Sequence, residues 1–181
     1  MAVDRRRSPS PHGAARFRPL SPGEAPGKAG ELLGGLAGRR GQVGAMVATM
    51  AHSPAVLAGY LELSRAMKRA QLDRKLSERV SIAVQARLRC QTCLDAHIEA
   101  ARRVGVGDEE IQAALAADSA DAGVAALLRF AMMVLTGPAG LDDADIVGLL
   151  DHGYSEQEVL DVVGVVALNQ LTGSFNLVVG L

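Results

Sequence analysis

The stretch at residues 155–176, SEQEVLDVVGVVALNQLTGSFN, decides the fold class of this chain. Ser155 and Glu158 match the S-x-x-E pattern of a capping box, in which two side chains satisfy free amides at a helix start. A long apolar run follows them without a strong turn signal. This pattern predicts a long apolar helix from Ser155 to about Asn176.

Start and stop signals upstream of this helix divide the preceding residues into further helices. The predicted helices cover about residues 42–51, 54–70, 77–88, 108–117, 121–136 and 142–152. Their expected starts are Ser53-Pro54, Ser77, Asp108 and Asp142, and two of their ends are marked by Gly137-Pro138 and Gly153. No stretch carries a convincing strand pattern, so the predicted fold class is all-α, a compact multi-helix bundle.

Composition and charge exclude several classes of protein. The 181 residues are 49% hydrophobic and 22% charged, which is ordinary for a globular protein and excludes fibrous or wholly disordered chains. The chain has no Trp, two Tyr and three Phe, and its net charge is −1, so nucleic acid is not an expected partner. A core of Ala, Leu and Val buries few large side chains, which makes a homo-oligomer a reasonable expectation.

The N-terminal region differs in composition from the rest of the chain. Residues 1–30 hold five of the seven prolines and six basic against two acidic side chains, which predicts a disordered basic tail. Residues 31–41 are Gly-rich and predict a lead-in with one weak helical turn. The expected organisation is therefore a tail over 1–41 and one helical domain over 42–181. The chain shows neither a run of 18 apolar residues nor a secretory signal, which predicts a cytoplasmic protein with no membrane span.

The chemistry-bearing residues lie in the stretch CQTCLDAH, residues 90–97, which holds the only two cysteines. A Cys90–Cys93 disulfide would close so short a loop that it would contribute only about 2 kcal/mol to stability. Three residues apart on a helix, the two Cα atoms would lie roughly 5 Å apart, so the bond can form and break. His97 falls on the same helical face, and a helix starting near Cys90 would favour a thiolate in its first turn. Arg87 and Arg89 add positive potential, and the pattern indicates a reactive thiol pair.

Two other interpretations of this stretch remain open. A structural zinc site needs four ligands, and the chain has no second Cys pair, while the other histidines have no ligand spacing. Two inert cysteines buried beside a histidine would also fit the spacing. Neither a metal nor a cofactor is predicted.

The pattern Glu78-(x11)-Cys90-x-x-Cys93-x-x-x-His97 resembles the signature of alkyl hydroperoxidase D and its relatives in the carboxymuconolactone decarboxylase family. The stretch LSER at 76–79 and the run at 152–176 also resemble these proteins, so the likeness covers roughly residues 42–181. It implies an alkyl hydroperoxidase D-like helical bundle that forms homo-oligomers, often trimers or hexamers. It further implies a peroxidase that reduces a small hydroperoxide at the expense of an external dithiol, a thioredoxin-like protein or a lipoyl reductant.

The resemblance also implies a role for each matching residue. Cys93 would be the thiol oxidised to a sulfenic acid, and Cys90 would resolve it to a disulfide and meet the external reductant. Glu78, with His97 and water, would take the thiol proton. Alkyl hydroperoxidase D has a histidine just before its second cysteine, and this chain has Thr92, so part of its proton relay is missing or rerouted. The alternatives are a decarboxylase-like lyase with incidental cysteines and a non-catalytic redox-sensing helical oligomer.

The residues alone leave the position of Glu78 open. Glu78 lies twelve residues before Cys90, near the expected start of the preceding helix. Antiparallel helices would keep it away from Cys90, whereas a steep crossing would bring it to His97. The alternative role is a first-turn acid favoured by the helix dipole.

Overall fold

The computed structural model describes residues 15–40 and 42–181, and in these residues every regular secondary-structure element is a helix, which confirms the all-α prediction. The elements in this part of the chain are α1 (Lys28–Arg40), α2 (Ala45–Met50), α3 (Pro54–Met67), α4 (Arg74–Leu88), α5 (Gln91–Arg103), α6 (Asp108–Leu115), α7 (Ala122–Thr136), a 3-10 turn (Pro138–Gly140), α8 (Asp143–Asp151) and α9 (Glu156–Val179).

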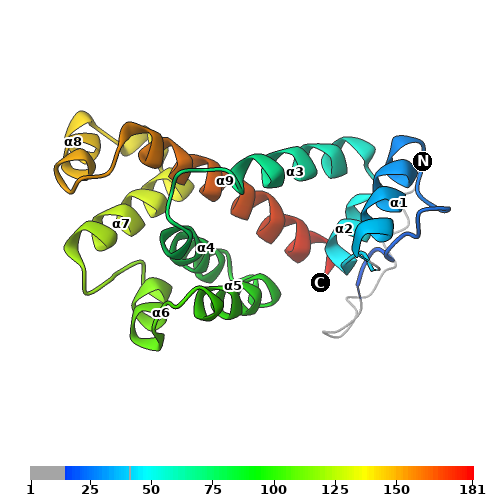
Figure 1. The fold of residues 1–181 in the computed structure, drawn as a ribbon, viewed down its shortest axis with the longest axis horizontal. Coiled ribbons are helices and arrows are strands. Elements are labelled where there is room, and N and C mark those ends of the chain that lie inside the picture. Colours follow the sequence, from blue (N-terminus) through cyan, green and yellow to red (C-terminus); the bar gives the residue numbers. More distant parts are fainter. Residues whose placement is uncertain (1–14, 41) are drawn as a thin grey trace, which may run out of the picture.

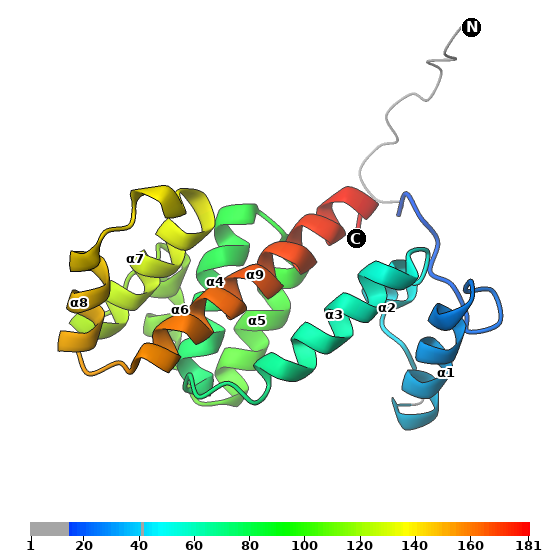
Figure 2. The same cartoon turned by 90° about the horizontal axis from the view of Figure 1, so that it is seen from above.

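Two helices, α4 and α9, form the centre of the molecule (Figure 1). Helices α5, α6 and α7 pack on α4, while α3 lies alongside α9 (Figure 2). The main core contains fully buried apolar side chains from α4, α6, α7 and α9, including Val80, Ile82, Val84, Ile111, Leu127, Leu128 and Val162. This core fixes the α4–α5 pair that carries the residues of interest.

A glycine allows α9 to approach α4 closely. A Cβ atom on Gly173 would lie 2.5 Å from Gln85 Oε1 and 2.8 Å from Leu88 Cδ1. Such distances are too short for real Cβ contacts, so a side chain at this position would require the ends of the Gln85 and Leu88 side chains to move. Gly173 therefore leaves room for these two side chains of α4 against α9.

Most predicted helix boundaries agree with the structure. Ser53 caps α3, Asp142 caps α8, and a capping box opens α9 at Ser155, as expected; the capping box that Asp142 forms with Asp145 was not predicted. Helix α3 ends at Met67, before its predicted end, whereas α9 continues to Val179. Gly107 rather than Asp108 is the N-cap of α6.

The predicted start of α4 at Ser77 is wrong. Helix α4 begins at Arg74, and the N-cap is Asp73, whose Oδ1 accepts hydrogen bonds from the backbone amides of Lys75 and Leu76 at 2.8 and 3.4 Å. A carboxylate that accepts two free amides stabilises an earlier start, and Ser77 then lies inside the helix. Glu78 is consequently in the second turn and is not a first-turn acid.

The prediction of a disordered N-terminal tail is also wrong where it can be compared; residues 1–14 lie outside the described residues. Helix α1 occupies the Gly-rich stretch that was expected to hold one weak turn. Leu20, Ala29 and Leu33 are buried in a second, smaller core. Their partners there are Met50, Ala51 and Leu57. A few well-placed apolar side chains therefore order a segment whose average composition predicts disorder.

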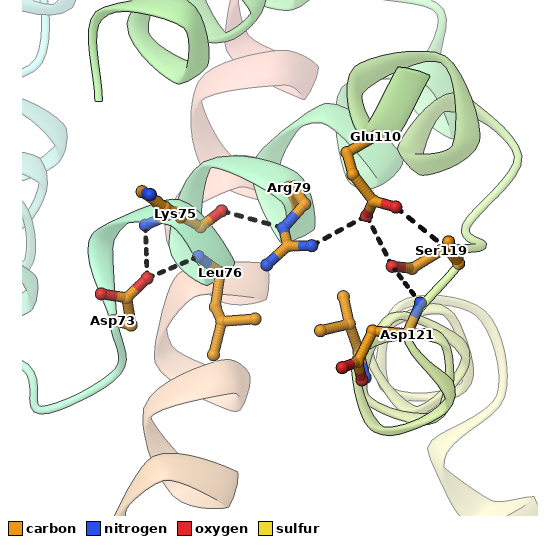
Figure 3. Close-up of polar contacts among 9 residues, drawn as sticks. Asp73, Lys75, Leu76, Arg79, Glu110, Ser119 and Asp121 are labelled. Atoms are coloured by element: carbon orange, nitrogen blue, oxygen red, sulfur yellow. Dashed lines mark hydrogen bonds and ion pairs between the residues drawn. The ribbon is translucent and has the colours of Figure 1, made fainter. Parts of the chain in front are cut away.

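A polar junction joins α4, α6 and the start of α7 (Figure 3). The Arg79 guanidinium donates to Glu110 Oε2 at 2.9 Å, and the Ser119 hydroxyl donates to the same oxygen at 2.5 Å. These bonds, led by the one from Ser119, lower the pKa of Glu110 below its usual range. The junction holds α6 against α4 beside the main core.

Helix α9 is long and apolar enough to cross a membrane by length and composition, and it is the one such helix in the part of the chain that the structure describes. In the structure one face of this helix packs against α3, α4 and α7.

Candidate active site

The two cysteines lie at the junction of α4 and α5. Arg89 ends α4 in the left-handed region, at φ 62°, and the chain turns so that Cys90 becomes the N-cap of α5. Cys93 is therefore in the first turn of α5, as predicted, where backbone amides favour a negative charge. Cys90 and Cys93 form a disulfide with a Cα–Cα distance of 5.4 Å.

The structure brings Glu78 and His97 into direct contact. His97 Nδ1 lies 2.7 Å from Glu78 Oε2, which resolves the position that the residues alone left open. An ionised carboxylate only accepts hydrogen bonds, so Nδ1–H is the donor. When Nδ1 carries the proton in this bond, Nε2 of the neutral ring has a free lone pair and can accept a proton.

Arg74 occupies the second oxygen of the same carboxylate. Its Nη2 atom lies 2.5 Å from Glu78 Oε1, one helical turn away on α4. The Glu78 side chain is 3% exposed and the Arg74 side chain 60% exposed. The guanidinium therefore reaches from solvent to a buried carboxylate and balances its charge, so the carboxylate is held in one orientation toward His97.

A cavity of about 330 Å³ opens against these residues. Cys93, His97 and Glu78 line one side of it, together with Thr92 at the position where the family histidine was expected. The other walls are mainly apolar and come from several helices, with Met46, Tyr60, Met67, Val165 and Leu168. The cavity can hold a small, partly apolar molecule next to the Cys93 sulfur.

The two cysteines differ in their access to this cavity. Cys93 lines it, whereas Cys90 is 1% exposed and lies at the buried start of α5. This difference fits the expected attack by Cys93. The expected meeting of Cys90 with an external reductant requires the first turn of α5 to move.

The sequence prediction did not include Arg74, and it also missed a polar residue on α9. The side-chain amide of Asn176, on α9, donates from Nδ2 to Cys93 Sγ at 3.2 Å. Asn176 lies seven residues after Asn169, on the face of α9 that meets α4, and Asn169 binds Ser81 and Gln85 there. The signal in the sequence was a pair of amides at helical spacing within an otherwise apolar helix.

Within residues 15–40 and 42–181, no group of three or more His, Cys, Asp or Glu side chains is placed to hold a metal ion.

Comparison with protein families gives one match. Residues 54–137, from the start of α3 to the end of α7, match the carboxymuconolactone decarboxylase family. This segment contains Glu78, Cys90, Cys93 and His97. The sequence matches no curated protein.

Several solved structures share the fold. A protein described as an alkylhydroperoxidase AhpD core, an uncharacterised peroxidase-related protein from Ralstonia eutropha JMP134, is 22% identical with a TM-score of 0.76, over 94% of this chain and 92% of the other. A peroxidase-related protein from Silicibacter sp. TM1040 is 18% identical with a TM-score of 0.71, over 87% and 85% of the two chains. A cysteine-to-alanine variant of the debrominase Bmp8, in complex with 2,3,4-tribromopyrrole, is 19% identical with a TM-score of 0.71, over 93% and 91%.

The family match and these folds agree with the resemblance that the cysteine motif indicated. The segment that carries the thiol pair and the Glu78–His97 contact matches the carboxymuconolactone decarboxylase family, and the chain has an alkyl hydroperoxidase D-like fold.

Proposed function

We propose that the protein is a thiol-dependent hydroperoxide reductase in which Cys93 attacks the peroxide and Cys90 resolves the product. The observation that carries the proposal is the cavity in which Cys93 lies beside the hydrogen-bonded His97–Glu78 pair. The peroxidase-related descriptions of the relatives with this fold support it.

The first step is removal of the Cys93 thiol proton. A free cysteine has a pKa near 8.5, so only a few per cent is ionised at neutral pH. His97 can take the proton at Nε2, because its other nitrogen is held by Glu78. The first turn of α5 stabilises the thiolate that results.

The thiolate then attacks the terminal oxygen of the hydroperoxide. An S–O bond forms as the O–O bond breaks, and the departing alkoxide takes its proton from His97 and leaves as an alcohol. Cys93 becomes a sulfenic acid. The Cys90 thiol attacks this sulfur and releases water, which gives the Cys90–Cys93 disulfide. An external dithiol reduces the disulfide by exchange, so two electrons pass from dithiol to peroxide.

The proposal therefore includes three kinds of partner. The substrate is a small hydroperoxide, and the reductant is a dithiol, either a thioredoxin-like protein or a lipoyl group. Further copies of the chain complete a homo-oligomer, which the exposed apolar side chains of α9 support, among them Leu160, Val163 and Val178.

The test is steady-state consumption of hydrogen peroxide and of an organic hydroperoxide, with dithiothreitol, a thioredoxin system and dihydrolipoamide as reductants. We expect turnover that disappears in Cys93→Ser and in Cys90→Ser. Absence of turnover with every peroxide and reductant would contradict the proposal. Thr92→His would then test whether the missing family histidine accounts for the inactivity.

Parallel assays separate the alternatives. Decarboxylation of a muconolactone that survives Cys93→Ser would favour the lyase. Dithiol-dependent loss of bromide from 2,3,4-tribromopyrrole, the ligand of a debrominase with this fold, would indicate another use of the same thiols. A disulfide that forms without any turnover would favour a redox sensor.

A further inference from the structure

The Asn176 side chain occupies an unusual polar environment. The residue is 5% exposed, and its Nδ2 donates to the Cys93 sulfur at 3.2 Å. Its amide oxygen is buried and accepts no hydrogen bond in the structure. A disulfide sulfur has no hydrogen and is a weak acceptor, so both ends of this amide are poorly satisfied in the oxidised protein.

Such an arrangement is costly unless another state of the site satisfies it. Leaving a buried polar group without a partner costs about 1–3 kcal/mol. A thiolate is a far stronger acceptor than a disulfide sulfur, because hydrogen bonds to charged groups are stronger than those between neutral groups. The Nδ2–H of Asn176 therefore gains most when Cys93 is reduced and ionised.

The fold holds Asn176 in this position. Gly173 allows α9 to lie close to α4, and Asn169, seven residues earlier, anchors the same face of α9 through Ser81 and Gln85. Asn176 then lies in the cavity wall across from α5. The packing of α9 against α4 therefore positions the Asn176 side-chain amide beside the Cys93 sulfur.

We propose that Asn176 takes part in the reaction through both ends of its amide. Its N–H donates to the Cys93 thiolate and lowers the pKa of that thiol, and its free oxygen accepts the O–H of the hydroperoxide. The second bond would hold the terminal oxygen next to the sulfur, with the O–O bond directed away. This inference rests on the proposed function for its substrate half, while the thiolate half concerns the reduced protein alone.

The thiolate half is tested by the pH profile of iodoacetamide alkylation in reduced Cys90→Ser protein, where Cys93 is the only thiol. We expect Asn176→Leu and Asn176→Ala to raise the Cys93 pKa by about one unit or more, because they remove a hydrogen bond to the charged form. Two variants are used so that one remains if the other does not fold, as judged by circular dichroism. An unchanged profile in a folded variant would overturn this half.

Thr172→Val is the matched control. Thr172 lies one turn before Asn176, and its hydroxyl donates to the carbonyls of Leu168 and Asn169 within α9. Removing this hydroxyl alters a polar group on the same helix without touching the sulfur. Its alkylation profile should match the parent; a shift as large as that of Asn176→Ala would show a general effect of α9 and overturn the assignment to Asn176.

The substrate half is tested in the same Cys90→Ser background by the rate of Cys93 sulfenylation with hydrogen peroxide. The rate is measured at a pH where Cys93 is fully ionised in both proteins, which removes the effect of the pKa. We expect Asn176→Ala to remain slower by about three- to tenfold, the value of one neutral hydrogen bond. Equal rates would overturn this half. Failure of the proposed function would give a different result. The wild-type protein would then show no peroxide turnover, while the alkylation profile of the Asn176 variants would still be altered.

Discussion

Both carboxylate oxygens of Glu78 are occupied, one by His97 and the other by Arg74. The buried carboxylate therefore cannot rotate freely, and it fixes the ring orientation and tautomer of His97. At the scale of single residues, this contact is the one through which the proposed reaction would activate Cys93. The sequence motif named both partners, but only the crossing of α4 and α5 brings them together.

Glu78→Gln should slow alkylation of Cys93 at pH 7, because the amide no longer stabilises the protonated imidazole that forms when His97 takes the thiol proton. General-base assistance is typically worth about 10²–10⁴-fold in rate, so the loss should be large. The effect should shrink at high pH, where the thiol ionises without help. The measurement is the alkylation rate of reduced Cys90→Ser protein from pH 6 to 10.

His97→Ala should behave like Glu78→Gln, and the double variant should be little slower than either single one, because residues that act as a unit are not additive. If Glu78→Gln reacts as fast as its parent at every pH, Glu78 serves only to hold the helices together and the relay is wrong.

At the scale of elements, the local rules correctly predicted the capping side chains Ser53, Asp142 and Ser155. They failed at α4, where Asp73 and Ser77 can both cap a helix and lie one turn apart. The structure has Asp73 as the N-cap. The contact of Asn176 with Cys93 was not predicted for a different reason. It depends on which helices pack against α9. Local sequence patterns carry no information about that packing.

The junction between α4, α6 and α7 gives a pH-dependent contribution to stability. The pKa of Glu110 is lowered, mainly by the Ser119 hydroxyl and further by the amide of Ala120 and by Arg79. The stabilisation by ionised Glu110 is fully present above the ordinary pKa of the carboxyl group in the unfolded chain. It is lost as the pH falls through the lowered pKa of Glu110 in the folded protein. Glu110→Gln should therefore reduce the free energy of unfolding by about 1.5–3 kcal/mol at pH 7, the size of a hydrogen bond to a charged group.

Urea unfolding at pH 7 and pH 3 checks this prediction, with exposed Glu109→Gln as the control. The difference in the free energy of unfolding between Glu110→Gln and wild type should be smaller at pH 3 than at pH 7. A difference that stays constant, or one that Glu109→Gln reproduces, would refute the role of the junction.

The C-terminal end of α9 is capped by a residue from the other end of the chain. The Arg16 amide donates to the carbonyl of Val179 at 2.7 Å, and its guanidinium donates to those of Leu177 and Val178 at 2.9 and 2.7 Å. Arg16→Ala removes a positive charge and two bonds from free helix carbonyls. It should lower stability by about 0.5–1.5 kcal/mol, which corresponds to a fall in Tm of about 1–6 °C.

Differential scanning calorimetry of Arg16→Ala, with Arg16→Lys as the charge-retaining control, measures this effect. We expect the Tm of Arg16→Lys to lie between those of wild type and Arg16→Ala, because lysine keeps the positive charge but lacks the several N–H donors of the guanidinium. An unchanged Tm in Arg16→Ala would show that the contact does not stabilise α9.

At the scale of the whole molecule, average composition does not predict the structure of the N-terminal segment. The stretch before residue 42 is rich in Pro and Gly, yet Leu20, Ala29 and Leu33 are buried against α2 and α3. Composition averages over a window, whereas a core needs only a few side chains in the right places. The helical domain therefore extends further toward the N-terminus than its composition indicates.

Leu33→Ala should destabilise the protein by about 2–5 kcal/mol, because Leu33 is fully buried and its removal leaves a cavity in the smaller core. Exposed Glu31→Ala, on the same helix, should change little. Urea unfolding of both variants checks this, and a loss below about 0.5 kcal/mol in Leu33→Ala would mean that α1 does not contribute to the stability of the fold.

Cys93 is proposed to be the thiol that a hydroperoxide oxidises, and trapping of the sulfenic acid distinguishes it from Cys90. Reduced Cys90→Ser and Cys93→Ser proteins are each treated with one equivalent of hydrogen peroxide in the presence of dimedone, and the adducts are located by peptide mass spectrometry. We expect an adduct on Cys93 in Cys90→Ser and little or none on Cys90 in Cys93→Ser. An adduct on Cys90 in Cys93→Ser, with none on Cys93 in the reciprocal variant, would contradict it.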